Sequence, residues 1–170
     1  ENPPGTITGN TVWHSGSTVI IDSNVIIASG AKLTIGSNCL IDMTSGKSLT
    51  VSDNGVLEIG AGTIFKLQRA DLYNFSIQGT IKANGTSANP IVFTSYKDDS
   101  TGGNTNGGSA FEEGERGDWS RLYFYNTDPG SYLNYCEFRY GGRSNSSPYY
   151  CPQLDIYSSD LAINNCKVSF

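Results

Sequence analysis

Short runs in which apolar and polar residues alternate recur through the first hundred residues of this chain. Three of them are KLTI at 32–35, VLEI at 56–59 and IFKL at 64–67. Gly, Asn or Ser separates one run from the next, and no segment before residue 100 carries the 3.6-residue period of an amphipathic helix. The pattern predicts short β-strands joined by tight turns.

These runs belong to a repeat. Residues 24–43 align without a gap on residues 48–67, 24 positions later, so that Leu33 falls on Leu57 and Leu57 in turn on Ile81. A fixed period of this size is typical of a solenoid, in which each unit buries its apolar face only against its neighbours. With three strands and three turns per unit, the repeat predicts an all-β parallel β-helix of about 24 residues per coil and five or six coils, stacked about 4.8 Å apart.

The second half of the chain repeats more loosely. Residues 134–140 match residues 164–170, which places Cys136 and Cys166 on neighbouring coils. We expect the additional residues to form a loop insertion at 141–152, and the longest irregular stretch, 97–118, to form a second one.

The domain prediction is therefore an N-terminal extension or cap over residues 1–16, followed by one β-helix domain over residues 17–170. A sandwich of β-hairpins is the alternative fold, because Asp53-Asn54-Gly55 and Asn84-Gly85 are typical hairpin turns. A sandwich does not readily explain an ungapped 24-residue repeat, so the solenoid is favoured.

Composition narrows the classes of partner. The 170 residues include only 16% charged residues and carry a formal net charge of −5, which argues against nucleic acid or an anionic membrane surface as a partner. No apolar run approaches the roughly 18 residues that a membrane span needs.

The four cysteines, Cys39, Cys136, Cys151 and Cys166, match no zinc-binding spacing. Their even number fits secretion and allows three disulfide pairings, whereas buried unpaired thiols are the alternative.

A family resemblance is carried by motifs that follow one another along most of residues 17–170. They are GTIKA at 79–83, GT at 85–86, NPIVFTS at 89–95, GDWSRLYF at 117–124 and L-x-Y-C-x-F-x-Y-G-G at 133–142. The chain resembles the right-handed parallel β-helix repeat proteins of secreted and cell-surface bacterial proteins, within the pectate-lyase-like fold. The resemblance implies a right-handed helix in a secreted or surface-exposed protein. That family includes polysaccharide lyases and hydrolases, adhesins and proteins without known chemistry. Where its members often carry Gly-Gly after the Trp, this chain has Ser120-Arg121.

Two groups of residues are candidates for a ligand site. On the strands at 119–125 and 153–157 the outward residues form a face on which a sugar could lie: Arg121, Tyr123, Tyr125, Asp155 and Tyr157. A cross-strand aromatic ladder that only stabilises the sheet is the alternative interpretation.

The second group consists of acids that the 97–118 loop could gather around a calcium ion, although their spacing matches no known calcium loop: Asp98, Asp99, Glu112, Glu113, Glu115 and Asp118.

No catalytic residue is predicted. A lyase on this scaffold needs clustered carboxylates beside a base, and the acids here are scattered. Asp42 and Lys66 share a coil position and are expected as outward neighbours on the surface. If the chain is an enzyme, the fold favours a polysaccharide lyase or glycoside hydrolase.

The ends of the repeat bear on assembly. The repeat runs up to Phe170, an expected inward position, without a cap sequence behind it. An open terminal coil exposes strand edges, so we expect either a longer parent chain or a second molecule that covers this end and extends a filament. The sequence therefore predicts a non-catalytic structural or adhesive module, and a carbohydrate-binding or polysaccharide-degrading protein is the alternative.

Overall fold

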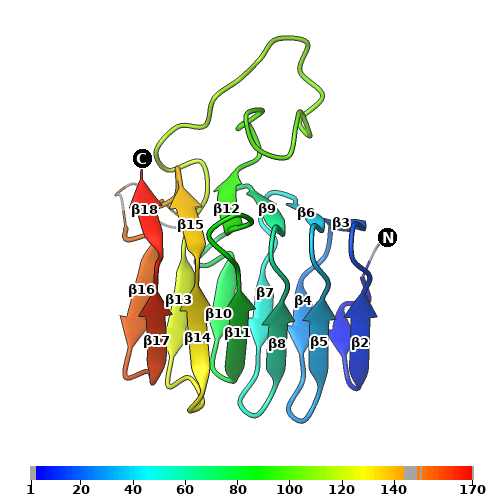
Figure 1. Cartoon of the computed structure of the whole chain (residues 1–170), viewed down its shortest axis with the longest axis vertical. Helices are drawn as coiled ribbons and strands as arrows, with labels where there is room; N and C mark the ends of the chain where they lie inside the picture. Colours follow the sequence, from blue (N-terminus) through cyan, green and yellow to red (C-terminus); the bar gives the residue numbers. More distant parts are fainter. Residues whose placement is uncertain (1–2, 144–148, 150, 170) are drawn as a thin grey trace.

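The structure, a computed structural model, describes residues 3–143, 149 and 151–169, and within them every regular element is a β-strand (Figure 1). No helix that could span a membrane occurs in this part of the chain. The strands form three parallel sheets of six strands each, and consecutive strands along the chain pass from sheet to sheet. The fold is therefore a parallel β-helix of six coils, which confirms the predicted fold class.

Each sheet receives one strand from every coil. Sheet A contains β1 (Thr6–Ile7), β4 (Val25–Ile27), β7 (Leu49–Val51), β10 (Phe75–Ile77), β13 (Leu122–Tyr125) and β16 (Leu154–Tyr157). Sheet B contains β2 (Asn10–Trp13), β5 (Lys32–Ile35), β8 (Val56–Ile59), β11 (Thr80–Asn84), β14 (Ser131–Asn134) and β17 (Leu161–Asn164). Sheet C contains β3 (Thr18–Ile21), β6 (Leu40–Met43), β9 (Ile64–Leu67), β12 (Ile91–Ser95), β15 (Cys136–Arg139) and β18 (Lys167–Ser169).

The register of the ladders reproduces the sequence repeat. Leu33 pairs with Leu57, and Leu57 pairs with Ile81. All three side chains point inward and are fully buried, because a strand with period two places alternate residues on the same face. The ungapped sequence repeat therefore corresponds to a column of inward, stacked residues in sheet B.

The corner between sheets B and C shows why Gly and Asn punctuate the repeat. The residue at the same corner position has a positive φ in five of the six coils, and the equivalent residue of coil four is Pro90. These residues are Gly16, Asn38, Gly62, Tyr135 and Asn165. Gly and Asn tolerate this left-handed conformation better than other residues, so the turn geometry selects them.

The middle of the core contains a stack of phenylalanines. The ring of Phe93 lies parallel to that of Phe65, with centroids 4.7 Å apart, and to that of Phe138 at 5.0 Å. Phe75 from sheet A meets the rings of Phe65 and Phe93 edge-on, at 5.4 and 5.7 Å. Because consecutive coils place like residues one above the other, the core gains ring contacts between coils three, four and five.

The 97–118 loop leaves the solenoid after β12 and returns before β13, and it lies beyond one end of the sheet C strands (Figure 1). It covers part of the outer face of sheet C, where a Cβ on Gly102 would lie 3.1 to 3.3 Å from side-chain atoms of Leu40, Ile64 and Lys66. All five residues of β12 are consequently buried, on its inner and its outer side. Sheet C thus has two covered faces at this level.

Ser120 occupies the position where the resembled family often has Gly. Its buried hydroxyl accepts a hydrogen bond from the Ala70 amide and donates one to the Ala70 carbonyl, both at 2.9 Å. The neighbouring Trp119 is buried and donates from Nε1 to the carbonyl of Arg139. Ser120 therefore joins the segment before β13 to the corner that follows β9.

The two ends of the solenoid differ. Residues 6–13, which the sequence assigned to an N-terminal extension, form β1 and β2 of the first coil, and there Ile7 and Trp13 are only 2% and 3% exposed. In coil six the inward residues are much more open: Ile156, Ile163 and Val168 are 44%, 43% and 51% exposed. The first coil closes its end of the core, whereas within the described residues the apolar side chains of the sixth coil stay about half exposed. Phe170, part of the 141–152 insertion (144–148 and 150) and residues 1–2 lie outside the described residues.

Replacing Phe93 by alanine tests the phenylalanine stack. The variant loses two ring stacks and leaves a cavity, so we expect it to lower the free energy of unfolding by about 3–5 kcal/mol. Urea unfolding followed by circular dichroism measures the change. The matched control is Thr50→Ala on the outer face of β7, which should change stability by no more than about 0.5 kcal/mol. Equal, small effects of both substitutions would contradict this account of the core.

Candidate functional site

The predicted tyrosine face lies on the outer side of sheet A. The ladder of β13 and β16 sets Tyr123 opposite Asp155 and Tyr125 opposite Tyr157, as the repeat predicted. The rings of Tyr125 and Tyr157 are nearly parallel, with centroids 5.6 Å apart. Arg121 Nη1 lies 3.0 Å from Asp155 Oδ2. The structure therefore brings all five predicted residues together.

The sequence did not reveal that Tyr73 belongs to the same face. Its ring stacks on that of Tyr123 at 4.6 Å, and the guanidinium carbon of Arg121 lies 5.0 Å from its centroid. Tyr73 precedes β10 in a corner segment outside the repeat, so coil periodicity gave no signal for it. Strict alternation from the inward Phe75 would place Tyr73 on the inner side, so the strand pattern gave no signal for it either.

The four tyrosines form a chain of stacked rings across coils four to six, since Tyr123 and Tyr125 also lie parallel at 6.1 Å. Because ring faces meet one another, the interior rings of the chain present their edges and hydroxyls rather than their faces outward. Tyr157, at one end, is 59% exposed. The arrangement stabilises coil stacking in the manner of a cross-strand aromatic ladder.

Two hollows adjoin this tyrosine face. One, of about 200 Å³, lies beside Tyr73, and its lining includes the polar side chains of Asn24, Ser48, Thr50 and Ser76. The other, of about 190 Å³, is formed by Asp53, Gln78, Tyr125 and Asn126. Hydroxyl and amide groups next to aromatic edges are suited to polar, ring-shaped ligands.

The six acids of the 97–118 loop do not come together. Asp98 is buried against sheet C, where its Oδ2 accepts a hydrogen bond from Thr94 and lies 3.9 Å from Arg139 Nη1. Asp118 accepts from Ser95 at 2.7 Å and pairs with Lys97 at 3.2 Å.

The remaining acids face other surroundings. Asp99 Oδ2 accepts from the amide of Glu112, and the side chain of Glu112 binds Asn106, while Glu113 and Glu115 are exposed. Among the residues described, no group of three or more His, Cys, Asp or Glu is placed to hold a metal ion. The acids instead fasten the loop to the solenoid at two separate points.

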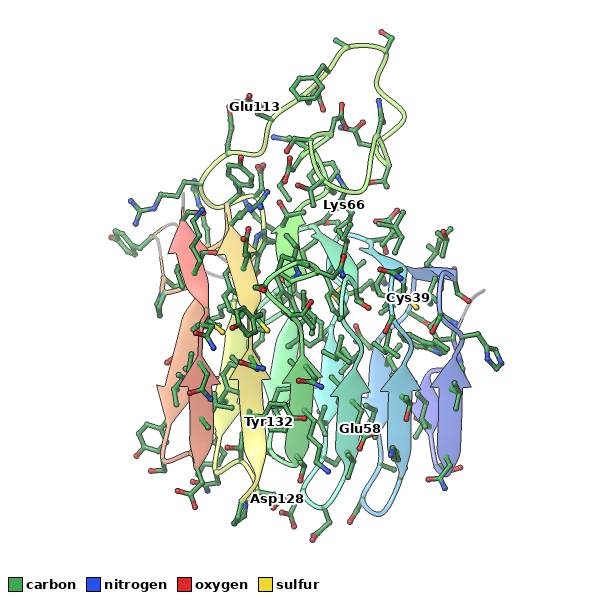
Figure 2. All side chains as sticks on the ribbon, viewed as in Figure 1. Cys39, Glu58, Lys66, Glu113, Asp128 and Tyr132 are labelled. Atoms are coloured by element: carbon green, nitrogen blue, oxygen red, sulfur yellow. The ribbon has the colours of Figure 1, made fainter. Side chains whose placement is uncertain are left out.

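Lys66 departs from its predicted place on the surface. The β6–β9 register does set it beside Asp42, but the 97–118 loop lies over it and Lys66 is fully buried, with Nζ donating to the carbonyl of Asp98 (Figure 2). Burial lowers the pKa of Lys66, and the nearby Asp98, Asp99 and Asp42 oppose that shift. The prediction of an exposed pair is wrong, because the sequence could not show which face the loop covers.

A second outer surface, on sheet B, was not identified from the sequence. A groove of about 680 Å³ runs over this sheet, and its lining includes the outward column Thr34, Glu58, Lys82 and Tyr132. Figure 2 shows Glu58 and Tyr132 on this face. Glu58 lies 2.5 Å from Lys32 Nζ and 3.7 Å from Lys82 Nζ. The 24-residue spacing of Thr34, Glu58 and Lys82 was the signal that could have predicted the column.

The ion pairs of Glu58 give stability a definite pH dependence. The hydrogen bond from Lys32 is the largest influence on the pKa of Glu58 and lowers it, the charge of Lys82 adds to this, and partial burial opposes it. A carboxyl whose folded pKa lies below its unfolded value of 4.5 stabilises the protein above that pH, and this contribution is lost as the pH falls through the folded pKa.

We therefore expect Glu58→Gln to lower the free energy of unfolding at pH 7 by less than about 1 kcal/mol, since the partners are partly exposed. The difference from the wild type should shrink as the pH falls below 4.5, as measured by urea unfolding at pH 7 and pH 3. Glu113→Gln, at an exposed position of the 97–118 loop, is the control and should match the wild type at pH 7. A Glu58→Gln deficit that persisted undiminished at pH 3 would contradict the electrostatic origin.

Comparison of the chain with protein-family models, with curated proteins and with solved structures gives no match. The structure supports the resemblance to pectate-lyase-like proteins as far as the parallel β-helix. The secreted bacterial type stays a prediction.

Proposed function

We propose that this chain is a non-catalytic structural or adhesive module, acting outside the cell or at its surface, that associates through its sixth coil. The observation that carries the proposal is the exposure of coil-six core residues. Ile156 pairs in register with Phe124, and Val168 with Phe138. The coil-five partners are fully buried, while the coil-six residues are about half exposed. Covering such side chains is favourable, by about 25 cal/mol per Å² of apolar surface.

The partner that we propose for this face is a second copy of the same face, with a further coil of a longer parent chain as the alternative. Three edge strands, β16, β17 and β18, border the apolar residues and offer backbone groups on their free side. In the first coil Ile7 and Trp13 are already buried. A head-to-tail contact would therefore place the apolar face of the sixth coil against a first coil that has few exposed inward apolar side chains. Two sixth coils match in character, and such a symmetric contact closes as a pair.

The outer faces support a structural role as well. The charged groups on them bind groups of neighbouring coils: Arg121 of coil five pairs with Asp155 of coil six, and Glu58 pairs with Lys32 and Lys82 of the coils on either side. The stacked tyrosines do the same on sheet A. These contacts stabilise the stacking of one coil on the next, and a structural or adhesive module needs such a rigid stack.

Val168→Asp tests the association. A carboxylate in the apolar face would be desolvated on contact, so we expect the dissociation constant of the pair to rise at least about tenfold. Light scattering and sedimentation velocity across a concentration series measure the mass. Ile20→Asp, at an exposed outward position of coil one, is the matched control and should associate like the wild type.

Circular dichroism of both variants distinguishes lost association from lost folding. A wild-type chain that stays monomeric at every concentration would overturn the proposed association. Growing filaments would overturn the closed pair and favour head-to-tail stacking.

Carbohydrate binding at the tyrosine face is the second candidate function, favoured by the two polar hollows beside the ring chain. We expect Tyr125→Ala to weaken binding of a captured oligosaccharide about tenfold, because Tyr125 borders one hollow and supports Tyr157. A glycan array followed by calorimetry makes the measurement. Tyr132→Ala on sheet B is the matched control and should retain affinity. No binding across the array, or equal losses in both variants, would contradict this candidate.

A further inference from the structure

Two of the four thiols meet across the last pair of coils. The β15–β18 ladder pairs Glu137 with Lys167, so the residues just before them, Cys136 and Cys166, occupy equivalent corner positions. Each follows a residue with positive φ, Tyr135 or Asn165 respectively, so the backbone turns in the same way at the two corners. Neighbouring strands lie about 4.8 Å apart, within the range of Cα separations that a disulfide spans.

The sulfur of Cys166 reaches over coil five. It accepts a hydrogen bond from the amide of Cys136 at 3.4 Å, and its thiol lies 3.5 Å from the carbonyl oxygen of Leu133. Both partners belong to the coil beneath it. Cys166 is also partly exposed, whereas Cys136 is buried, so an oxidant in solution can reach one member of the pair directly.

The other two cysteines are differently placed. Cys39 stands in the same corner column, but Thr63 and Ile91 lie between it and Cys136. Three coil spacings, about 14 Å, separate them, which is too far for a bond. Cys151 lies in the 141–152 insertion, where its amide donates to the carbonyl of Gly142 at 2.7 Å. Among the four cysteines, Cys136 and Cys166 are thus the pair that the ladders set at equivalent positions of adjacent coils.

We propose that Cys136 and Cys166 form a disulfide that fastens coil six to coil five when the protein meets a small-molecule disulfide. This inference does not depend on association of the sixth coil. The bond would close a loop that contains β16 and β17, and so would tether the coil whose core side chains are least covered.

The chemistry balances with glutathione disulfide as the oxidant. The Cys166 thiolate attacks one sulfur of glutathione disulfide, forms a mixed disulfide and releases one glutathione thiolate. The Cys136 thiolate then attacks Cys166 Sγ and releases the second glutathione. The two cysteines lose two protons and two electrons, which the two glutathione molecules carry as thiols. Burial, and then the neighbouring Cys166 thiol, raise the pKa of Cys136. Because Cys166 is the more exposed of the two, it reacts first.

The test oxidises the wild-type chain in glutathione buffers of increasing disulfide fraction, blocks remaining thiols with iodoacetamide and maps peptides by mass spectrometry. We expect a peptide pair joined through Cys136 and Cys166 to be the main cross-link. Hydrogen exchange should slow in β16–β18 at least about tenfold on oxidation, with little change in β4–β9.

Two variants complete the test. Cys166→Ser should lose both the cross-link and the slowing of exchange, while Cys151→Ser, the matched control, should keep both. Stable glutathione adducts on Cys166 without the intramolecular bond, or a main cross-link through Cys39 or Cys151, would overturn the proposal. If a variant fails to fold, the cross-link map and the hydrogen exchange of the wild-type chain still decide the proposal.

Discussion

The whole molecule depends on the cover that each coil gives to the next. A single coil of three short strands cannot bury its inward side chains, and only a neighbour in register does so. Leu57 is buried because Leu33 and Ile81 lie on either side of it in the ladder. Where no further coil follows in the described structure, as at Ile156 and Val168, the same inward positions are half exposed. The burial of inward side chains by neighbouring coils thus explains both the stability of the core and the exposure of apolar residues in the sixth coil.

The same stacking organises the outer faces. Register places Tyr125 against Tyr157 and sets Glu58 in one column with Lys82. The aromatic rings and charged side chains of neighbouring coils therefore contact one another. The result is a surface whose side chains largely support the solenoid. Hollows of ligand size in the described residues lie beside the tyrosine face, over sheet B, and at a corner lined by Arg69, Lys97 and Asp118.

The 97–118 loop makes the three sheets unequal. By burying Lys66 and both sides of β12 it withdraws part of the outer face of sheet C from solvent, whereas the outer face of sheet B keeps an open groove. A buried lysine is costly unless it is paired and hydrogen-bonded. Here the carbonyl of Asp98 and nearby carboxylates provide the partners. Of the six acids considered as calcium ligands, Asp98 and Asp118 hold this loop to the solenoid.

The sequence by itself determined the strands, the 24-residue register of β5, β8 and β11, the inward column of Leu33 and Leu57, and the stacking of Tyr125 on Tyr157. It could do so because a parallel β-helix converts a sequence offset directly into a spatial neighbour. Tertiary structure alone decided that Lys66 is buried, that Tyr73 joins the ring stack, and that residues 6–13 close the first coil. The 97–118 loop and the segment before β10 follow no repeat, so their contacts depend on where the chain returns in three dimensions, which the sequence pattern does not show.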